Sequence, residues 1–440
     1  MGKIAIVIAS ADGIMSLQTG VGIVVNFSFE AFPEIYQSLL LPETHLYALC
    51  PLVNTESSDF SKAAFDTVNF QCQKHNGKLI PLVNISSGNS LNEIWKGTGD
   101  FSPAEVWDSC CLELYKEVTR LSHDYERIVL ILHDTLFIKS TKYIEESHIE
   151  ICWIPHSLGT LFQAPNQNER ISFEKENINH LLLKGHKIGY ISAFTKDHLF
   201  KYYGVKNRDM VSFYSGIYFN SKKYTESRLL EEFLRSHGIP KEKKILFTWG
   251  RCSDQKGIDI IINAYASLIK ANTSLSENYH LLLLCPTETS YKEYLEKTLG
   301  LLDRLPAVSY TFIQTFQAQI QYEILSYDKT RIILLCSRYE SFGLTSIEAA
   351  YFANNLSTII YSPLPTFKEV LQNNPNAIEL ELLSPECLQQ TIIKEINKTN
   401  HHKPSLVQRE RMHRQFSFVD NYRNGLTQLF FSNQITKTHN

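Results

Sequence analysis

The stretch RIILLCSRYESFGLTSIEAA at Arg331–Ala350 decides the fold class of this 440-residue chain. It opens with an almost entirely apolar run, Arg331–Cys336, which is typical of a strand buried in a parallel sheet. A loop with Gly343 follows, and a helix is expected to begin near Thr345. A buried strand, a glycine loop and a helix in this order indicate one unit of a doubly wound α/β sheet.

Apolar runs of the same kind recur on both sides of that stretch. They predict strands at Ile4–Ala9, Ile128–Leu132, Ile149–Ile154, Lys187–Ile191, Lys244–Trp249, His280–Cys285 and Leu356–Tyr361. A charged stretch that contains Gly238 and Pro240, Ser221–Lys244, divides these runs into two groups. We therefore predict two Rossmann-like doubly wound α/β domains in tandem, with the carboxyl ends of their strands facing a cleft.

The composition is that of a packed protein of balanced charge. Hydrophobic residues make up 43% of the chain, and 43 Lys and Arg against 46 Asp and Glu give a formal net charge of −3, which argues against a dedicated nucleic-acid binder. The nine cysteines contain no C-x-x-C pair, which favours reduced thiols. No apolar run approaches the roughly 18 residues of a membrane span. We expect a cytoplasmic protein, for which peripheral membrane contact stays open.

The Arg331–Ala350 stretch also carries candidate chemistry. Backbone N–H groups in the Gly343 loop and the positive end of the helix suit a phosphate. Glu340 in the loop and Glu348 on the helix could both point toward a ligand resting on this turn. The alternative is that Thr345 and Glu348 form a capping box, which requires no ligand.

Two cations follow the strand predicted at Lys244–Trp249. Arg251 and Lys256 lie in a strand-to-helix loop, where they could neutralise a departing diphosphate. The alternative is two surface cations near a helix start. Because the helix dipole disfavours positive charge there, we favour the functional interpretation.

Together these residues resemble the retaining family 4 glycosyltransferases of the two-Rossmann-domain (GT-B) fold. The resemblance extends over most of the chain. The matching segments are Gly250-Arg251 with Lys256-Gly257, Ser337–Leu344 with Glu348, Pro155-His156-Ser157, Ser192–Lys196 and Phe416–Tyr422.

The resemblance implies a role for each residue of the candidate site. Glu348 is expected to bind the ribose hydroxyls of the donor, and Glu340 the hydroxyls of its sugar. Arg251 and Lys256 are expected to stabilise the leaving phosphates, with His156 near the sugar. The residues expected to bind the donor through a loop or its backbone N–H groups are Ser341, Phe342, Gly343, Leu344, Thr345, Gly20 and Gly22.

The implied reaction is retaining transfer of a sugar from a nucleotide-diphosphate sugar, with a UDP-sugar favoured, to an acceptor hydroxyl by front-face attack. No cofactor is expected. The sequence has no Asp-x-Asp to hold a metal, and we interpret His401-His402 with His413 as a solvated linker. The acceptor stays open among a sugar, an aminocyclitol-like natural product, a lipid and a protein. The alternatives are a non-catalytic sugar-nucleotide-binding scaffold and an NAD-dependent dehydrogenase, which the missing G-x-G-x-x-G disfavours.

The resemblance also implies a division of the chain. We predict an acceptor domain over 1–215, a linker over 216–243, a donor domain over 244–415 and a C-terminal helix over 416–440 that returns to the first domain. His133-Asp134 is a candidate for acceptor contact, with a strand-end cap as the favoured alternative. The departures from the family pattern surround the donor and leave its identity open: Ser341, Thr345, Phe352–Asn355, Ser215–Tyr218 and Pro363–Thr366.

Overall fold

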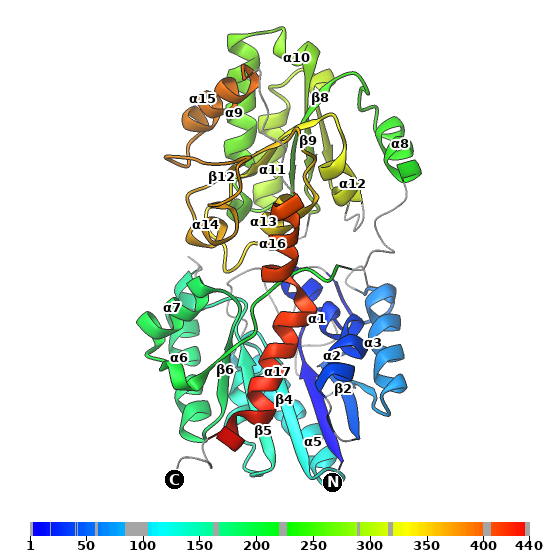
Figure 1. The fold of residues 1–440 in the computed structure, drawn as a ribbon, viewed down its shortest axis with the longest axis vertical. Helices are drawn as coiled ribbons and strands as arrows, with labels where there is room; N and C mark the ends of the chain where they lie inside the picture. The colour runs from blue at the N-terminus through cyan, green and yellow to red at the C-terminus, as the bar shows by residue number, and fades with distance from the viewer. Residues whose placement is uncertain are drawn as a thin grey trace. The chain divides into compact units, whose positions relative to one another are not determined.

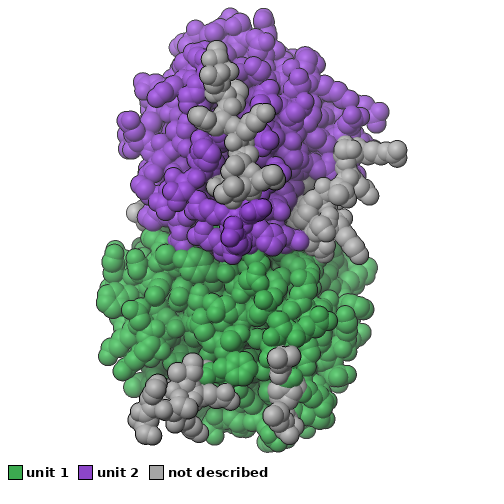
Figure 2. All heavy atoms as spheres, in the orientation of Figure 1, with its two compact units in different colours: residues 1–218, 416–440 green, residues 219–415 purple. Residues whose placement is uncertain are grey.

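The computed structural model divides the chain into two compact units, coloured separately in Figure 2. Unit 1 comprises Met1–Tyr218 and Phe416–Asn440, and unit 2 comprises Phe219–Gln415. The residues that the structure describes are 3–17, 19–39, 41, 43–57, 60–83, 104–161, 167–219, 227–287, 291–315, 320–398 and 406–435.

Unit 1 contains a seven-stranded sheet, and all its neighbouring strands pair in parallel. The strand order is β3-β2-β1-β4-β5-β6-β7, so the direction of winding reverses between β1 and β4. The strands are β1 (Ile4–Ala9), β2 (Thr44–Pro51), β3 (Leu79–Leu82), β4 (Arg127–His133), β5 (Ile149–Ile154), β6 (Lys187–Tyr190) and β7 (Met210–Ser212). The central strands are buried on both faces, which explains why they are apolar runs without alternation.

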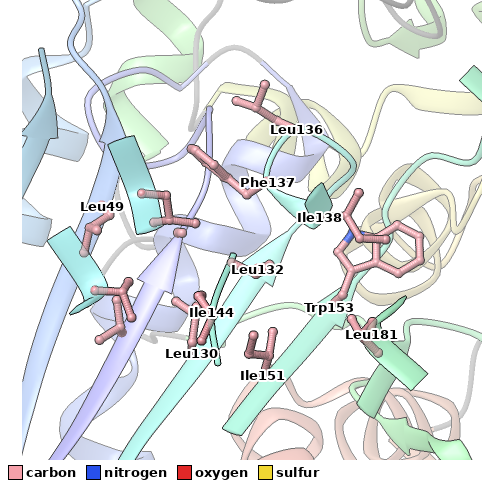
Figure 3. Packing of buried hydrophobic residues seen from close by; sticks show 14 of the residues in the cluster. Leu49, Leu130, Leu132, Leu136, Phe137, Ile138, Ile144, Ile151, Trp153 and Leu181 are labelled. Atoms are coloured by element: carbon pink, nitrogen blue, oxygen red, sulfur yellow. The ribbon is translucent and has the colours of Figure 1, made fainter. Parts of the chain in front are cut away.

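Helices pack around this sheet (Figure 1). They are α1 (Gly20–Glu30), α2 (Phe32–Leu39), α3 (Lys62–Lys74), α5 (Ala104–Ser122), α6 (Gln167–Leu183), α7 (Ala193–Tyr203) and α17 (Phe418–Ile435). Figure 3 shows part of the core, in which Trp153 of β5 lies beside Leu181 of α6; Leu130 of the neighbouring strand β4 belongs to the same cluster. Burial of such side chains contributes about 25 cal/mol per Å² of apolar surface, so this layer supplies much of the stability of unit 1.

Unit 2 contains a six-stranded parallel sheet in the order β10-β9-β8-β11-β12-β13. Its strands are β8 (Lys244–Trp249), β9 (Tyr279–Leu284), β10 (Tyr310–Ile313), β11 (Thr330–Leu335), β12 (Thr358–Tyr361) and β13 (Ala377–Glu379). Its helices are α8 (Ser227–Ser236), α9 (Ile258–Ala271), α10 (Leu275–Asn278), α11 (Lys292–Leu302), α12 (Ile320–Ser326), α13 (Leu344–Phe352), α14 (Pro365–Leu371), α15 (Pro385–Ile396) and α16 (Leu406–Phe416).

The predicted fold class is confirmed, because each half of the chain forms a parallel α/β sheet of the Rossmann type. All eight strands predicted from apolar runs are present, and their ends agree to within two residues. Within the matching segment Ser192–Lys196, the Ser192 side chain accepts a hydrogen bond from the N–H of Thr195 and caps α7.

The segment predicted as a linker, 216–243, is divided between the units. Gly216–Tyr218 belong to unit 1, and α8 belongs to unit 2. Within unit 1 the backbone of Ile217 pairs with that of Phe416 and Phe418, with N···O distances of 2.9 and 3.1 Å. A Cβ atom on Gly216 would lie 2.3 Å from the carbonyl oxygen of Phe416, so this pairing requires glycine.

Candidate functional site

The candidate site in unit 2 lies where β8 and β11 end. These two strands are hydrogen-bonded neighbours, and the strand order reverses at β8, so their carboxyl ends form a topological switch point. The loop from β8 to α9 carries Arg251 and Lys256, and the loop from β11 to α13 carries Glu340. Lys256 and Glu340, which are 84 positions apart in sequence, are therefore brought together by the sheet.

The two loops are tied to each other. The backbone N–H of Arg338 donates to the carbonyl oxygen of Gln255 at 2.7 Å, and Gln255 Nε2 donates to the carbonyl oxygen of Tyr339 at 3.2 Å. The Arg338 guanidinium binds both carboxylate oxygens of Asp259, at 3.0 and 2.9 Å. Burial raises the pKa of Asp259, but hydrogen bonds from Arg338, Lys297 and Tyr294 outweigh it and hold this pKa well below its ordinary value. The ion pair between Arg338 and Asp259 therefore stays charged at neutral pH.

The structure brings Lys256 and Glu340 into direct contact. Lys256 Nζ lies 2.5 Å from Glu340 Oε1, and the Ser337 hydroxyl donates to the same oxygen at 2.8 Å. The two side chains are 14% and 8% exposed. A cation and a carboxylate are thus fixed side by side at the end of the sheet, where each retains further capacity to bind a ligand.

Arg251 is half-buried in the same loop as Lys256. Its guanidinium donates to the Tyr291 hydroxyl at 3.3 Å and to Gln255 Oε1 at 3.4 Å. It also lies over the Tyr291 ring, 5.8 Å from the centroid. Gln255 therefore links Arg251 to the loop that carries Glu340, so the two cations and the carboxylate are held by one framework.

Glu348 lies in the second turn of α13 and is 5% exposed. Its Oε2 accepts a hydrogen bond from Trp249 Nε1 at 2.7 Å, and its Oε1 accepts one from the Tyr322 hydroxyl at 3.1 Å. Burial raises the pKa of Glu348, against the effect of these two hydrogen bonds and of the charge on Lys256. The capping-box alternative is wrong, because the N-cap of α13 is Gly343 and Glu348 is bound elsewhere.

The N-terminus of α13 has the conformation that an anion site requires. Gly343 adopts φ +79°, and a Cβ atom there would lie 2.6 Å from the Phe367 ring. The helix begins at Leu344, one residue before the predicted start, and in this described part of the chain no side chain caps it. The first N–H groups of the helix and its dipole are thus oriented to bind an anion. Ser341 and Phe342 precede this turn, and Thr345 lies in it.

Comparison with known proteins finds a family match within unit 2. Residues 231–412 match the family described as "Glycosyl transferases group 1". Over this segment, which is less than half of the chain, the sequence is similar to that family. The chain is also 26% identical to mannosylfructose-phosphate synthase of Agrobacterium fabrum over 227 residues, which are 47% of this chain and 47% of that protein. The chain thus spans about half the length of the curated relative it matches.

Solved structures share the fold over nearly all of the chain. Sucrose-phosphate synthase from Thermosynechococcus elongatus superposes with a TM-score of 0.69 at 13% identity, and the match covers 100% of both chains. The α,α-trehalose-phosphate synthase (UDP-forming) from Burkholderia xenovorans superposes with a TM-score of 0.65 at 11% identity, over 98% of this chain and 100% of that one. The predicted resemblance to glycosyltransferases of the GT-B fold is confirmed.

The backbones of the two loops of the candidate site approach each other closely at Gly257. Gly257 adopts φ +62°, and a Cβ atom there would lie 2.1 Å from the carbonyl oxygen of Cys336. We expect Gly257→Ala to lower the free energy of unfolding by at least about 2 kcal/mol, because both the backbone strain and the clash must be relieved. Gly300→Ala is the control: it lies in α11 with open space around it, and should raise stability by about 0.5–1 kcal/mol. Urea unfolding measures both, and equal stability of the two variants would contradict the prediction.

The remaining predicted catalytic residue, His156, belongs to unit 1. It follows β5, and its Nε2 lies 2.9 Å from Nδ1 of His133, which ends β4. Burial lowers the pKa of His156 to about 3 and holds that of His133 well below its ordinary value. Both imidazoles are therefore neutral at neutral pH, and one donates its proton to the other. His133 Nε2 is buried and has no partner among the described residues.

Asp134 follows the end of β4 and binds the loop after β5. This agrees with the strand-end cap that was the favoured alternative for His133-Asp134. It adopts the left-handed φ of +61°. Its carboxylate accepts hydrogen bonds from the N–H and the hydroxyl of Ser157, at 3.0 and 2.9 Å, and its carbonyl accepts one from Trp153 Nε1 at 2.7 Å. Asp134 thus fixes the residue that follows His156.

The sequence does not predict the buried polar network beside His156. Arg170 and Glu174 of α6 form an ion pair at 2.8 Å, and both side chains are 0% exposed. Arg170 Nη2 donates to Thr135 Oγ1 and to the Ser157 carbonyl, each at 3.0 Å. Glu174 accepts from the N–H of Gly159 at 2.9 Å. The i,i+4 spacing of Arg170 and Glu174 was the available signal, but it is equally typical of an exposed helix.

The predicted position of Gly20 and Gly22 in a loop is wrong. Both lie in the first turn of α1, directly after the N-cap residue Thr19. A Cβ atom on Gly22 would lie 2.4 Å from Oδ2 of Asp12, which also accepts from the N–H and the hydroxyl of Thr19 at 2.8 and 2.7 Å. The missing Cβ thus makes room for a carboxylate of the same unit. A donor contact of Gly20 or Gly22 stays a prediction.

The cysteines and histidines that the structure describes form no metal centre. In the described ranges no three His, Cys, Asp or Glu side chains are grouped to hold a metal ion. His401 and His402 lie outside those ranges, and His413 stacks on Phe219 with centroids 4.8 Å apart. All nine cysteines are free, and eight of them are buried. No helix in the part of the chain that the structure describes is long and apolar enough to cross a membrane.

Proposed function

We propose that the protein is a retaining glycosyltransferase that moves a sugar from a nucleotide-diphosphate sugar, with a UDP-sugar favoured, to an acceptor hydroxyl. The observation that carries the proposal is the contact between Lys256 and Glu340 at the ends of β8 and β11. Arg251, the uncapped N-terminus of α13 and Glu348 belong to the same structural framework in the segment that matches the group 1 family. Unit 2 would therefore bind the donor, and unit 1 would select the acceptor.

Each group has a task in such a transfer. Cleavage of the bond between sugar and phosphate leaves negative charge on the diphosphate and positive character on the sugar ring. Lys256, Arg251 and the N–H groups at the start of α13 supply fixed positive potential for the leaving diphosphate. Glu340 is placed to accept hydrogen bonds from donor-sugar hydroxyls, while Glu348 accepts them from the ribose. Ser341 and Phe342 shape the turn that holds the phosphates.

Front-face transfer requires no separate protein base in this proposal. The acceptor hydroxyl attacks on the side that the diphosphate leaves, and a phosphate oxygen of the departing group takes the acceptor proton. His156 is neutral and buried against His133, so we propose for it a hydrogen bond to the donor sugar rather than proton abstraction. No metal or cofactor is assigned a step, because the cations and the helix terminus supply the positive charge.

The acceptor class to test first is a sugar phosphate. The curated relative is a mannosylfructose-phosphate synthase, and the structural relatives include sucrose-phosphate synthase and a trehalose-phosphate synthase in complex with glucose-6-phosphate. We propose a cytoplasmic location, since nine free thiols are typical of a reducing compartment.

Donor binding tests the proposal. Thermal unfolding is measured with UDP-, GDP-, ADP- and dTDP-sugars, on the wild type and on Glu348→Ala. A ligand at about 100 times its dissociation constant should stabilise the protein by about 2.7 kcal/mol, and the variant should lose this shift. Stabilisation by no donor, or equal stabilisation of the variant, would contradict the assignment. Binding without any donor hydrolysis or transfer would favour the non-catalytic scaffold instead.

A further inference from the structure

We propose that Trp249 and Tyr322 are positioning residues that fix the Glu348 carboxylate to receive two neighbouring hydroxyls of one ribose ring. The inference rests on the proposed function, in which Glu348 binds the nucleotide. It adds that two side chains, which need not touch the ligand, set the preference for a ribonucleotide over a 2′-deoxyribonucleotide.

Two elements besides α13 hold the carboxylate. Trp249 at the end of β8 donates its indole N–H to Oε2, and Tyr322 of α12 donates its hydroxyl to Oε1. With one hydrogen bond on each oxygen, at 2.7 and 3.1 Å, rotation of the carboxylate about its last bond breaks at least one of them. The orientation of Glu348 is therefore determined by the protein.

The remaining acceptor capacity matches a vicinal diol. An ionised carboxylate has about four lone-pair sites, two on each oxygen. Trp249 and Tyr322 occupy one site on each, which leaves one site on each oxygen for a ligand. Two hydroxyls on adjacent carbons, such as O2′ and O3′ of ribose, can bind both remaining sites at once. A 2′-deoxyribose can bind only one, and leaves the other oxygen of a buried carboxylate without that partner.

Both positioning side chains are themselves held in place by aromatic packing. The Trp249 ring stacks on Phe247, with centroids 5.1 Å apart and planes at 10°. The Tyr322 ring packs against Phe352, with centroids 4.5 Å apart. Phe352 opens the segment Phe352–Asn355, where the sequence departs from the family pattern. The departure thus places an aromatic ring behind the tyrosine that binds Glu348.

Charge and burial make the arrangement sensitive to pH. The groups that face Glu348 are the Trp249 indole from β8, the Tyr322 hydroxyl from α12 and the Lys256 ammonium from the loop before α9. Burial raises the pKa of Glu348, and all three groups oppose that rise. Removal of either hydrogen bond should raise the pKa of Glu348 further, so that a nucleotide binds more weakly as the pH is lowered.

The test compares UDP with 2′-deoxy-UDP by calorimetric titration at several pH values. The variants are Tyr322→Phe, Trp249→Phe and Glu348→Gln, with Tyr351→Phe as the matched control, because Tyr351 lies on α13 and makes no hydrogen bond to Glu348. We expect the wild type to prefer UDP about tenfold. Tyr322→Phe and Trp249→Phe should reduce that preference to about threefold or less, while Tyr351→Phe should keep it.

The pH series distinguishes a positioning role from a merely structural one, because only a positioning role makes the loss of affinity depend on pH. The ratio of wild-type to variant affinity for UDP should grow as the pH falls in Tyr322→Phe and Trp249→Phe, and the titration of UDP itself cancels in this ratio. A loss that is equal for both ligands at every pH would overturn the inference. Unchanged UDP binding in Glu348→Gln would instead overturn the proposed role of Glu348. Tyr322→Phe retains the ring and its packing, so it decides the question even where Trp249→Phe folds poorly.

Discussion

Replacement of Lys256 by alanine is expected to lower the turnover number about 100- to 1000-fold. The reason is that a fixed cation beside a departing diphosphate stabilises charge that develops only in the transition state, and the loss of one such donor costs about 3–4 kcal/mol. The same change leaves Glu340 with the Ser337 hydroxyl and without its ion-pair partner. The rate is measured as nucleoside-diphosphate release when water accepts the sugar, a reaction that requires no other acceptor.

Lys292→Ala is the control for this prediction. Lys292 is a lysine of the same unit whose side chain is 79% exposed, and its replacement removes the same charge without a change in turnover. Arg251→Ala should lower turnover in the same direction as Lys256→Ala, because Gln255 joins its guanidinium to the same framework. If both Lys256→Ala and Arg251→Ala kept the wild-type rate, the leaving-group role of these cations would be excluded.

The core strands of the fold could be predicted because they are buried on both faces. Such strands are continuous apolar runs, and eight of them were located from sequence. The strands that were missed are short edge strands or carry polar groups. β13 is three residues long and half-buried. In β2, His45 and Tyr47 interrupt the apolar pattern, and both are buried because they hydrogen-bond to Tyr125 from another part of unit 1. A partner so distant in sequence cannot be foreseen from local periodicity.

In the candidate site, too, some features could be predicted from the sequence and others could not. Arg251, Lys256, Glu340 and Glu348 follow predicted strands, so their place at one end of a sheet could be predicted. Their partners could not, because Trp249 and Tyr322 reach Glu348 from elements 99 and 26 residues away. The observed start of α13 excludes the capping-box interpretation of Glu348. The sequence could not exclude it, because the ends of a helix are its least predictable part.

Glu174→Ala is expected to lower the free energy of unfolding by about 3–5 kcal/mol, the largest stability effect that we predict. The change removes the carboxylate from a fully buried ion pair and leaves the charge of Arg170 in a fully buried site without its nearest counter-charge. It also takes away the acceptor for the Gly159 N–H. Urea unfolding followed by tryptophan fluorescence measures the loss, because Trp107 and Trp153 are both buried in unit 1.

Glu117→Ala is the control, because Glu117 pairs with Arg120 on an exposed part of α5, and its loss should cost less than about 1 kcal/mol. The double variant Arg170→Met with Glu174→Leu separates charge from hydrogen bonding. Removal of both charges of the ion pair should restore part of the stability, although the Gly159 N–H still lacks its acceptor and the buried Asp134 carboxylate loses the nearby charge of Arg170. If the double variant were as unstable as Glu174→Ala, the lost hydrogen bonds would explain the whole effect. An apolar pair could stabilise α6 equally well, so the ion pair is best explained by the loops it fixes on either side of His156.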